Sequence, residues 1–453
     1  MQVSPKELLI EHRFQCSLHS IVKLLLPLLL ASFSSNIMFI VDRAVLAHYS
    51  MDAMLSSAIA GSFSYVPMQF LMNLVGVSVV FIGRLNGANK QKEIGNIVWQ
   101  MVYFSIAISI CYAVFSIFYE NFFCACCDAL IYQKILMATA GIPGISMALS
   151  SFLIGIGKSN YVIYTVLMSN VTNIILDIIL VFGNEWIQPF GLIGAAIATS
   201  IAQIIQNVTL FSIFCNKKNV ITYNVNHMKL NISIIKKALD IAMPVAASNA
   251  IESFAWYKLL VILTDASEIM GMIESFSISI ISFCMFFADS TMRASAAFFS
   301  NIIGARDKEA AKKTFLIFFR LNCCVWLCFA LPLVINQDIV FFFANQINPN
   351  MKHIYNDLHF VLVCIWVNIF FDGICYICRG ALQAGGDTKF PNYLNASTVW
   401  IAIVLPILFL KTSGQLTSIR MAYILSVIRS ITVTLFVYMR YKKFNWFVGC
   451  WQK

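Results

Sequence analysis

Four polar residues in the first half of the chain lie inside or at the end of long apolar segments. Asp42 closes the first segment, Asn173 and Asp177 lie in the fifth, and Thr199 lies in the sixth. Asn173 and Asp177 are four residues apart, so they share one face of a helix. A carboxylate in a bilayer is costly unless it faces a cavity or a partner. Because carboxylate, amide and hydroxyl oxygens can hold Na+ and carboxylates can take a proton, this set is a candidate cation site; an interfacial position is the alternative for Asp42.

The predicted spans of the second half carry acids of their own, namely Glu252, Glu274, Asp289 and Asp372. Asp289 and Arg293 are four residues apart in the order that favours pairing on a helix, which predicts a structural ion pair. Lys258 is a further basic residue that could neutralise one of these acids. Glu252 and Asp372 have no partner close in sequence, so we expect them to couple to an ion or to bind a cationic substrate.

The segments that carry these residues are typical of membrane-spanning helices. Of the 453 residues, 60% are hydrophobic and only 11% are charged, which is too few charges to cover a soluble protein. A spanning helix needs about 20 apolar residues, and runs of that kind recur along the chain, for example 97–118, 161–182, 192–214 and 315–334. The sequence therefore predicts an all-α polytopic membrane protein with about twelve transmembrane helices, located in the cell (inner or plasma) membrane.

The net charge of +10 is explained by topology rather than by a nucleic-acid partner. Most of the Lys and Arg residues fall at alternate ends of the predicted spans, which favours an even number of spans with both termini in the cytoplasm. The start of the chain is polar and resembles no cleavable signal peptide. The most basic loop, 217–237, lies near the middle and is interpreted as a cytoplasmic linker between an N-lobe (1–216) and a C-lobe (238–453), each with six spans.

The two predicted lobes share anchors in the same order. Pro27 and Pro244 lie in the first span of each lobe, at the same separation as Gly87-Ala88 and Gly304-Ala305, which end the second spans. Such parallel repeats predict two pseudo-symmetric lobes related by an axis along the membrane normal, as in transporters that rock about a central site. The two prolines are predicted to bend their helices; simple helix-start prolines are the alternative.

Three weaker patterns carry little functional weight. Gly157-Lys158-Ser159 is similar to the end of a phosphate-binding loop, but Phe152 stands where that motif requires glycine, so we expect no nucleotide site. Gly83 and Gly87 have a spacing compatible with close helix packing. The cluster Cys124, Cys126 and Cys127 is more typical of small buried hydrophobes than of a metal site or a disulfide. No cofactor or resident metal is expected beyond Na+ or H+ as a coupling ion.

Taken together, several of these motifs resemble those of multidrug and toxic compound extrusion (MATE) transporters over nearly the full length. The resemblance is carried by Pro27 with Asp42, by Asn173-x-x-x-Asp177, by Gly194-Ala-Ala-Ile-Ala-Thr199, by Pro244 with Glu252, and by the stretch from Arg379 to Pro391. The sequence departs from the family pattern around Ala47-His48, where a glycine is expected.

The resemblance implies a secondary antiporter with two six-helix lobes and a cavity that alternates between the two sides of the membrane. It implies export of organic, often cationic and amphiphilic, compounds against entry of Na+ or H+. Carried over residue by residue, the N-lobe ion site would comprise Asp42, Asn173, Asp177 and Thr199, and the C-lobe acids would be Glu252 and Asp372. It does not choose between the ions or the lobes.

Other functions remain as alternatives. A flippase for lipid-linked saccharides, or another carrier of the same superfamily, would have a strongly cationic cavity, whereas the basic residues within the spans are Lys258, Arg293, Arg320 and Arg429, against several acids. A membrane-embedded enzyme would need a catalytic constellation, and the sequence has no HExxH motif or cofactor fingerprint, so we expect no enzyme. A passive channel would transport without uphill coupling. We expect a monomer whose partners are a small-molecule substrate and the lipid bilayer.

Overall fold

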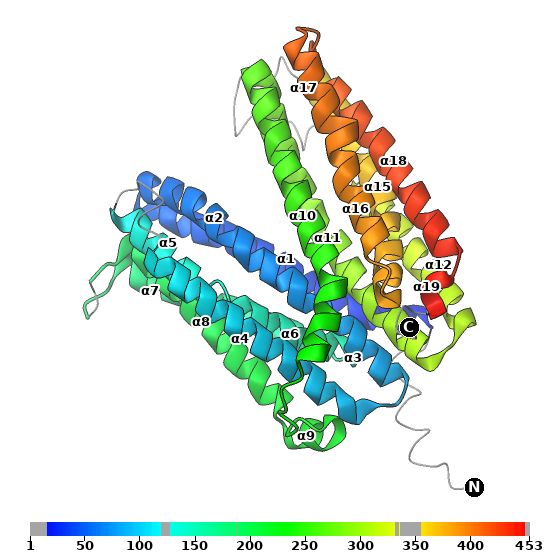
Figure 1. Ribbon diagram of the computed structural model, residues 1–453. Coiled ribbons are helices and arrows are strands. Elements are labelled where there is room, and N and C mark those ends of the chain that lie inside the picture. Colours follow the sequence, from blue (N-terminus) through cyan, green and yellow to red (C-terminus); the bar gives the residue numbers. More distant parts are fainter. Residues whose placement is uncertain (1–15, 119–126, 187, 331–334, 336–354, 449–453) are drawn as a thin grey trace. The chain divides into compact units, whose positions relative to one another are not determined.

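The computed structural model describes residues 16–118, 127–186, 188–330, 335 and 355–448, and every regular element in them is helical (Figure 1). Ten helical segments in these ranges are long and apolar enough to cross a membrane. The predicted all-α membrane fold is therefore confirmed. The figure of about twelve spans stays a prediction: α10 (Ile232–Ala266) and α12 (Lys308–Val325) are long enough but are not among the ten.

The described chain folds as two compact units. Unit 1 comprises Val22–Ala246 and Ser300–Arg306, and unit 2 comprises Cys16–Ile21, Ala247–Phe299 and the chain from Asp307 onward. The unit boundary at Ala246 lies inside α10, so this division follows compactness rather than the basic loop. The predicted lobes, with a linker at 217–237, stay a prediction.

Unit 1 is built from the helices coloured blue to green in Figure 1. They are α1 (Leu18–Tyr49), α2 (Met51–Gly76), α3 (Ser78–Gly87), α4 (Ile94–Phe118), α5 (Cys127–Thr139), α6 (Ile142–Gly155), α7 (Asn160–Phe182), α8 (Gly191–Phe214) and α9 (Lys217–Tyr223), with a 3-10 turn at Gln91–Glu93. Cys124 and Cys126 of the cysteine cluster lie outside the described residues. Asn216 caps α9, because its side chain accepts a hydrogen bond from the Lys218 N–H.

Helix α7 turns a polar stripe inward and an apolar face outward. Its buried residues recur at three- and four-residue spacing: Val162, Thr165, Ser169, Asn173, Asp177 and Val181. The opposite face exposes Val171, Ile175 and Ile178, as expected where lipid is the solvent. Small buried residues of α8, including Ala195 and Ala198, allow close approach of the two helices, and the Ser169 hydroxyl donates to the Ala202 carbonyl at 3.0 Å. This packing fixes the direction in which Asn173 and Asp177 point.

The close packing suggested by Gly83 and Gly87 is confirmed. A Cβ atom at Gly83 would collide with the Ser300 side chain, and one at Gly87 would collide with the Asn301 backbone. Ser300 and Asn301 belong to the last turns of α11 (Glu268–Ala305), in the stretch that forms part of unit 1. The Asn86 amide also donates to Asn301 Oδ1 at 2.7 Å, so glycine and amide contacts hold α3 against this segment.

Unit 2 contains most of α10 and α11, and the remaining helices coloured towards red in Figure 1. These are α12, continued by the π-helical turn η3 (Trp326–Ala330), α15 (Tyr355–Gly385), α16 (Lys389–Val399), the π-helical turn η5 (Trp400–Val404), α17 (Leu405–Thr412), α18 (Arg420–Lys442) and α19 (Asn445–Val448). Pro406 has no N–H to offer the Ala402 carbonyl, which accounts for the widened turn at η5. The apolar core joins α10, α11, α15 to α18 and η5; it includes Leu259, Leu263, Ile273, Val361, Ile403 and Ala422.

Both repeat prolines lie inside continuous helices rather than at helix starts. Pro27 lies within α1 and Pro244 within α10. Because proline has no N–H, the carbonyl four residues earlier lacks its usual helical partner. At Pro27 that carbonyl belongs to Lys23, and the Ser159 hydroxyl donates to it at 3.5 Å. The start-of-helix alternative therefore does not apply, and the bending role stays a prediction.

Candidate functional sites

The first site lies in unit 1, where α1 and α7 run side by side. The Asn170 amide of α7 donates to the Ser34 hydroxyl of α1 at 2.7 Å. About two turns further along both helices, the carboxyl groups of Asp42 and Asp177 lie within hydrogen-bonding reach of each other. Asn173 joins them, because its amide donates to Asp177 Oδ2 at 3.1 Å. The structure thus brings together three of the four residues expected from the sequence.

Among the described residues these carboxyl groups have no basic partner; Asp177 is buried and Asp42 is half-buried. Asp177 is 1% exposed and Asn173 is 4% exposed. One oxygen of each acid, Oδ1 of Asp42 and Oδ1 of Asp177, is buried and has no hydrogen-bond partner. Throughout the described ranges, neither acid forms an ion pair with Lys or Arg. Two adjacent carboxylates in such a setting repel one another, so a shared proton or a bound cation would stabilise them.

An apolar wall that includes Leu46 and Val181 lies one helical turn beyond the two acids. Leu46, Val181, Leu192 and Ala195 form part of a buried cluster, and Tyr132 of α5 packs against it. Tyr132 is close enough to both acids to feel their charge. An apolar wall strengthens electrostatic interactions inside it. Tyr132 does not stand out in the sequence, because one tyrosine among 16 in an apolar segment carries no distinguishing signal.

Thr199 is the fourth expected member of this set. It lies on α8, one turn after Ala195 of the apolar wall, and its hydroxyl donates to the Ala195 carbonyl at 3.0 Å. A hydroxyl bonded in this way keeps lone pairs that could face a cation. Its membership of the ion site stays a prediction.

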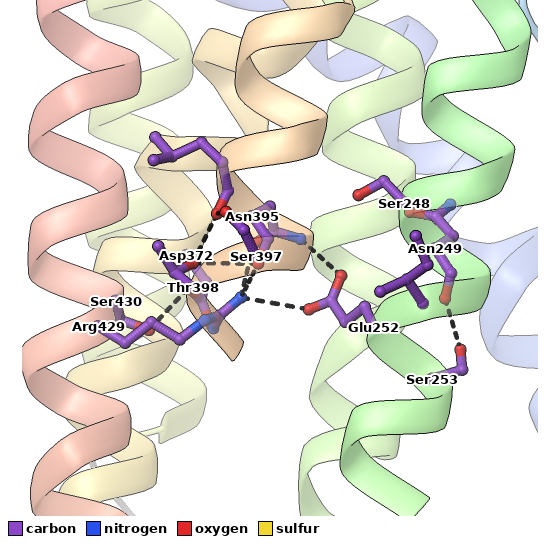
Figure 2. A network of polar contacts seen from close by, with 12 residues as sticks. Ser248, Asn249, Glu252, Ser253, Asp372, Asn395, Ser397, Thr398, Arg429 and Ser430 are labelled. Atoms are coloured by element: carbon purple, nitrogen blue, oxygen red, sulfur yellow. Dashed lines mark hydrogen bonds and ion pairs between the residues drawn. The ribbon is translucent and has the colours of Figure 1, made fainter. Parts of the chain in front are cut away.

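The second site lies in unit 2 and connects α10, α16 and α18 through a charged network (Figure 2). The Asn395 amide donates to Glu252 Oε2 at 2.6 Å. The terminal nitrogen Nη2 of Arg429 donates to Asn395 Oδ1 at 2.6 Å and lies 3.4 Å from Glu252 Oε1. The Arg429 side chain is 5% exposed and that of Glu252 is 22% exposed, so the pair is largely shielded from solvent.

Asp372 of α15 belongs to the same neighbourhood. The Ser430 hydroxyl donates to Asp372 Oδ1 at 2.9 Å, and Arg429 and Arg379 both attract this carboxylate. Arg379 donates through Nη2 to Asn392 Oδ1 at 2.6 Å. The structure therefore gathers the two predicted C-lobe acids into one network, together with two arginines.

The expectation about partners in unit 2 needs one correction. Glu252 is neutralised by Arg429, far away in sequence, and not by Lys258, whose ammonium group lies 5.5 Å from the centre of the Phe254 ring. Arg429 was noticeable in the sequence as a basic residue within a span, but nothing there indicated its partner. Asn395 and Ser430 were missed, because amides and hydroxyls are common in these helices.

The remaining acids of the second half lie outside this network. The predicted pair of Asp289 and Arg293 is confirmed, with 2.9 Å between Oδ2 of Asp289 and Nη2 of Arg293. Glu274 is buried on α11, where the Tyr423 hydroxyl donates to its Oε2 at 2.8 Å.

Comparisons with known proteins agree with this architecture. The MatE family model matches residues 27–179 and 244–408. The probable multidrug resistance protein NorM of Oceanobacillus iheyensis is 29% identical over 207 residues, which are 42% of this chain and 44% of that protein. The probable multidrug resistance protein YoeA of Bacillus subtilis is 21% identical over 435 residues, which are 90% of each chain.

Solved structures show the same fold. A transporter of the MOP superfamily from Pyrococcus furiosus, described as having a binding pocket of reverse polarity, superimposes with a TM-score of 0.83 at 16% identity and covers 98% of each chain. The matched family model extends over more than half of the chain and includes both repeat prolines. This protein therefore belongs to the MatE family, the multi-pass membrane transporters of multidrug and toxic compound extrusion.

Proposed function

We propose that this protein is a secondary antiporter that exports organic, amphiphilic cations in exchange for Na+ or H+ by alternating access. In this proposal about twelve spans form two six-helix lobes with both termini in the cytoplasm, and the protein works as a monomer without a cofactor and without catalysing a reaction. The observation that carries the proposal is the adjacent carboxyl pair of Asp42 and Asp177, with one buried, unpartnered oxygen on each acid.

The carboxyl pair supplies what coupling requires. A ligand shifts a conformational equilibrium only by its differential affinity for the two states. When a proton or Na+ enters, it removes the repulsion between Asp42 and Asp177 and stabilises the state in which they are adjacent. When the ion leaves, that state becomes costly and the transporter moves on to the state that binds cargo. Asn173 would orient Asp177 through its amide, and Thr199 would add a hydroxyl ligand for Na+.

Unit 1 is the better candidate for coupling because Asp42 and Asp177 form no ion pair with Lys or Arg in the part of the chain that the structure describes. In unit 2 the guanidinium group of Arg429 already faces Glu252. We therefore assign coupling to Asp42 and Asp177, and leave Glu252 and Asp372 outside the ion site. The names of the relatives NorM and YoeA indicate multidrug resistance, which supports drug-like cargo, whereas the reverse pocket polarity reported for the Pyrococcus furiosus protein suggests that this fold can also serve other cargo.

The proposal is tested by efflux of a fluorescent cationic dye from proteoliposomes under an imposed Na+ or pH gradient. The variants Asp42→Asn and Asp177→Asn should abolish gradient-driven efflux, and the effective gradient identifies the ion. Asp52→Asn is a matched control, since Asp52 is an exposed acid in the first turn of α2. If no gradient drives any cationic dye through the native protein, the drug antiporter is wrong and a carrier such as a lipid-linked saccharide flippase takes its place.

A further inference from the structure

The network around Glu252 leaves neither of its carboxylate oxygens free. Oε2 accepts a hydrogen bond from the Asn395 amide at 2.6 Å, and Oε1 faces Nη2 of Arg429 at 3.4 Å. Asn395 Oδ1 closes the triangle by accepting from the same Arg429 nitrogen at 2.6 Å, as Figure 2 shows. The three side chains come from α10, α16 and α18, so the triangle ties three helices of unit 2 together.

The orientation of the Asn395 amide is determined by its two charged neighbours. Its NH2 group faces a carboxylate and its oxygen faces a guanidinium. The flipped amide would set donor against donor at Arg429 and acceptor against acceptor at Glu252. Asn395 thus strengthens the ion pair by making a charge-assisted hydrogen bond to each partner.

The charges in this network balance. Arg429 and Arg379 both attract Asp372, and Arg429 also faces Glu252. Two guanidinium groups therefore stand against two carboxylates, all within unit 2. A mobile cation that entered would have to displace a buried, hydrogen-bonded arginine that cannot lose its own charge.

The unsatisfied atoms of the two sites differ in kind. In unit 2 the buried atoms without a partner include Nε of Arg429 and Nε of Arg379, which are donors. At the carboxyl pair of unit 1 they are Oδ1 of Asp42 and Oδ1 of Asp177, which are acceptors. The buried unpartnered atoms of the charged groups in unit 2 are therefore donors, whereas a cation needs acceptors such as those of the unit 1 pair.

We propose that Arg429 is the resident cation of the unit 2 acidic site, so that neither Na+ nor a cationic group of the cargo binds between Glu252 and Asp372. Arg429 is then a specificity-determining residue, because it confines free cations to the carboxyl pair of unit 1. The role of Arg429 in transport rests on the antiport proposed above. The test of Na+ binding does not rest on it, because Na+ binding can be measured without a gradient and without movement of cargo.

The first test uses the full chain purified in detergent, with its Tm measured as NaCl replaces N-methylglucamine chloride at constant ionic strength. The Na+ response of the native chain, whatever its size, should be unchanged in Glu252→Gln and in Asp372→Asn. A loss of that response in either variant, with the response retained in Asp177→Asn, would overturn the proposal. Because every variant in this first test keeps Arg429, the test does not depend on whether an Arg429 variant folds.

The second test removes the resident cation. Arg429→Gln should gain an Na+-dependent rise in Tm of about 2 °C, since a ligand that binds the folded state stabilises it. The rise should disappear in the double variant Arg429→Gln with Glu252→Gln. The matched control is Arg420→Gln on the same helix, which removes an ion pair with Asp357 at the protein surface and should gain no Na+ response. A folded Arg429→Gln protein without a new Na+ response would contradict the proposal.

The third test addresses cargo, with tetraphenylphosphonium as the probe in titration calorimetry. If Arg429 excludes cationic groups from the unit 2 network, Glu252→Gln should bind this cation within about twofold of the native affinity. A tenfold weaker affinity in Glu252→Gln would place the cation at Glu252 and overturn this part of the proposal.

Discussion

The two acidic sites of this transporter contain the same kinds of side chain and differ in what neutralises them. In unit 1, Asp42 and Asp177 face each other, and one oxygen of each is left without a partner. In unit 2, Glu252 and Asp372 lie beside Arg429, and the unpartnered atoms there include guanidinium nitrogens. A carboxylate within a span thus identifies a polar site, but the partner decides whether a cation is needed from outside.

The difference also separates two uses of a buried charge. The unit 2 network joins α10, α15, α16 and α18 with bonds that do not require a ligand, so it suits a structural and specificity role. The unit 1 pair is incomplete without a proton or a cation, so its energy changes when that ion binds or leaves. Four predictions test this comparison.

The largest effect is expected at the carboxyl pair. Asp177→Asn should reduce gradient-driven dye efflux by about 100-fold, because it removes the charge change that couples ion and cargo, whereas Glu252→Gln should reduce efflux by less than about threefold. The two rates are compared in proteoliposomes at equal protein content. If the reductions are reversed, the assignment of the two sites is reversed as well.

The second effect concerns stability. Arg429→Ala leaves Glu252 and Asp372 without their neutralising charge. It should lower the free energy of unfolding by about 3 kcal/mol, because a carboxylate that is largely buried is left without a partner. Thermal unfolding in detergent measures it. The double variant Arg429→Met with Glu252→Leu should recover most of the loss, whereas a double variant as unstable as the single one would show that Arg429 acts through packing alone.

The third effect compares the two amides. Asn395→Ala removes hydrogen bonds to two charged groups and should cost about 2 kcal/mol, and Asn173→Ala removes one bond to Asp177 and should cost about 1 kcal/mol. Tm measurements on both variants rank them. Equal costs would mean that the Asn395 bridge is no stronger than the single Asn173 contact.

The smallest effect is expected at Ser430. Ser430→Ala removes one hydrogen bond to Asp372 and should lower stability by less than about 1 kcal/mol, because Arg429 and Arg379 continue to attract the carboxylate. The same unfolding assay detects it, with Ser253→Ala as a control, since the Ser253 hydroxyl bonds only back to the Asn249 carbonyl of its own helix. A loss as large as that of Arg429→Ala would make Ser430, not the arginine, the main support of Asp372.

Much of the fold and part of the sites could be predicted from the sequence. Apolar runs of spanning length identify helices without any knowledge of their packing, and the spacing of Asn173 and Asp177 gives a shared face because helical period is a local property. The pairing of Asp289 with Arg293 was predictable for the same reason. The partnership of Glu252 with Arg429 was not, because it joins α10 to α18 and depends on how the helices pack.

Other features were hidden for related reasons. Tyr132 approaches the acids from α5, and only the packing of α5 against α2, α4 and α8 distinguishes it from other tyrosines of the chain. The pattern Gly83-x-x-x-Gly87 suggested close packing but could not name its partner, which is the end of α11. Local spacing therefore predicts faces and pairs within a helix, and the contacts between helices require the structure.

The π-helical turn η5 has a consequence for how this protein tolerates insertions and deletions. It lies between α16, which carries Asn395, and α17, and the indole of its first residue, Trp400, donates to the Ile251 carbonyl beside Glu252 at 3.3 Å. A π turn holds one residue more than an α turn, so deleting one residue there would restore a regular helix while the segments on either side keep their phase. The network at Asn395 and the core-facing side of α17 would both keep their orientation, whereas a one-residue deletion inside α17 itself would rotate the rest of that helix by about 100°. Chain length at this turn is thus under looser constraint than in the regular helices on either side of it.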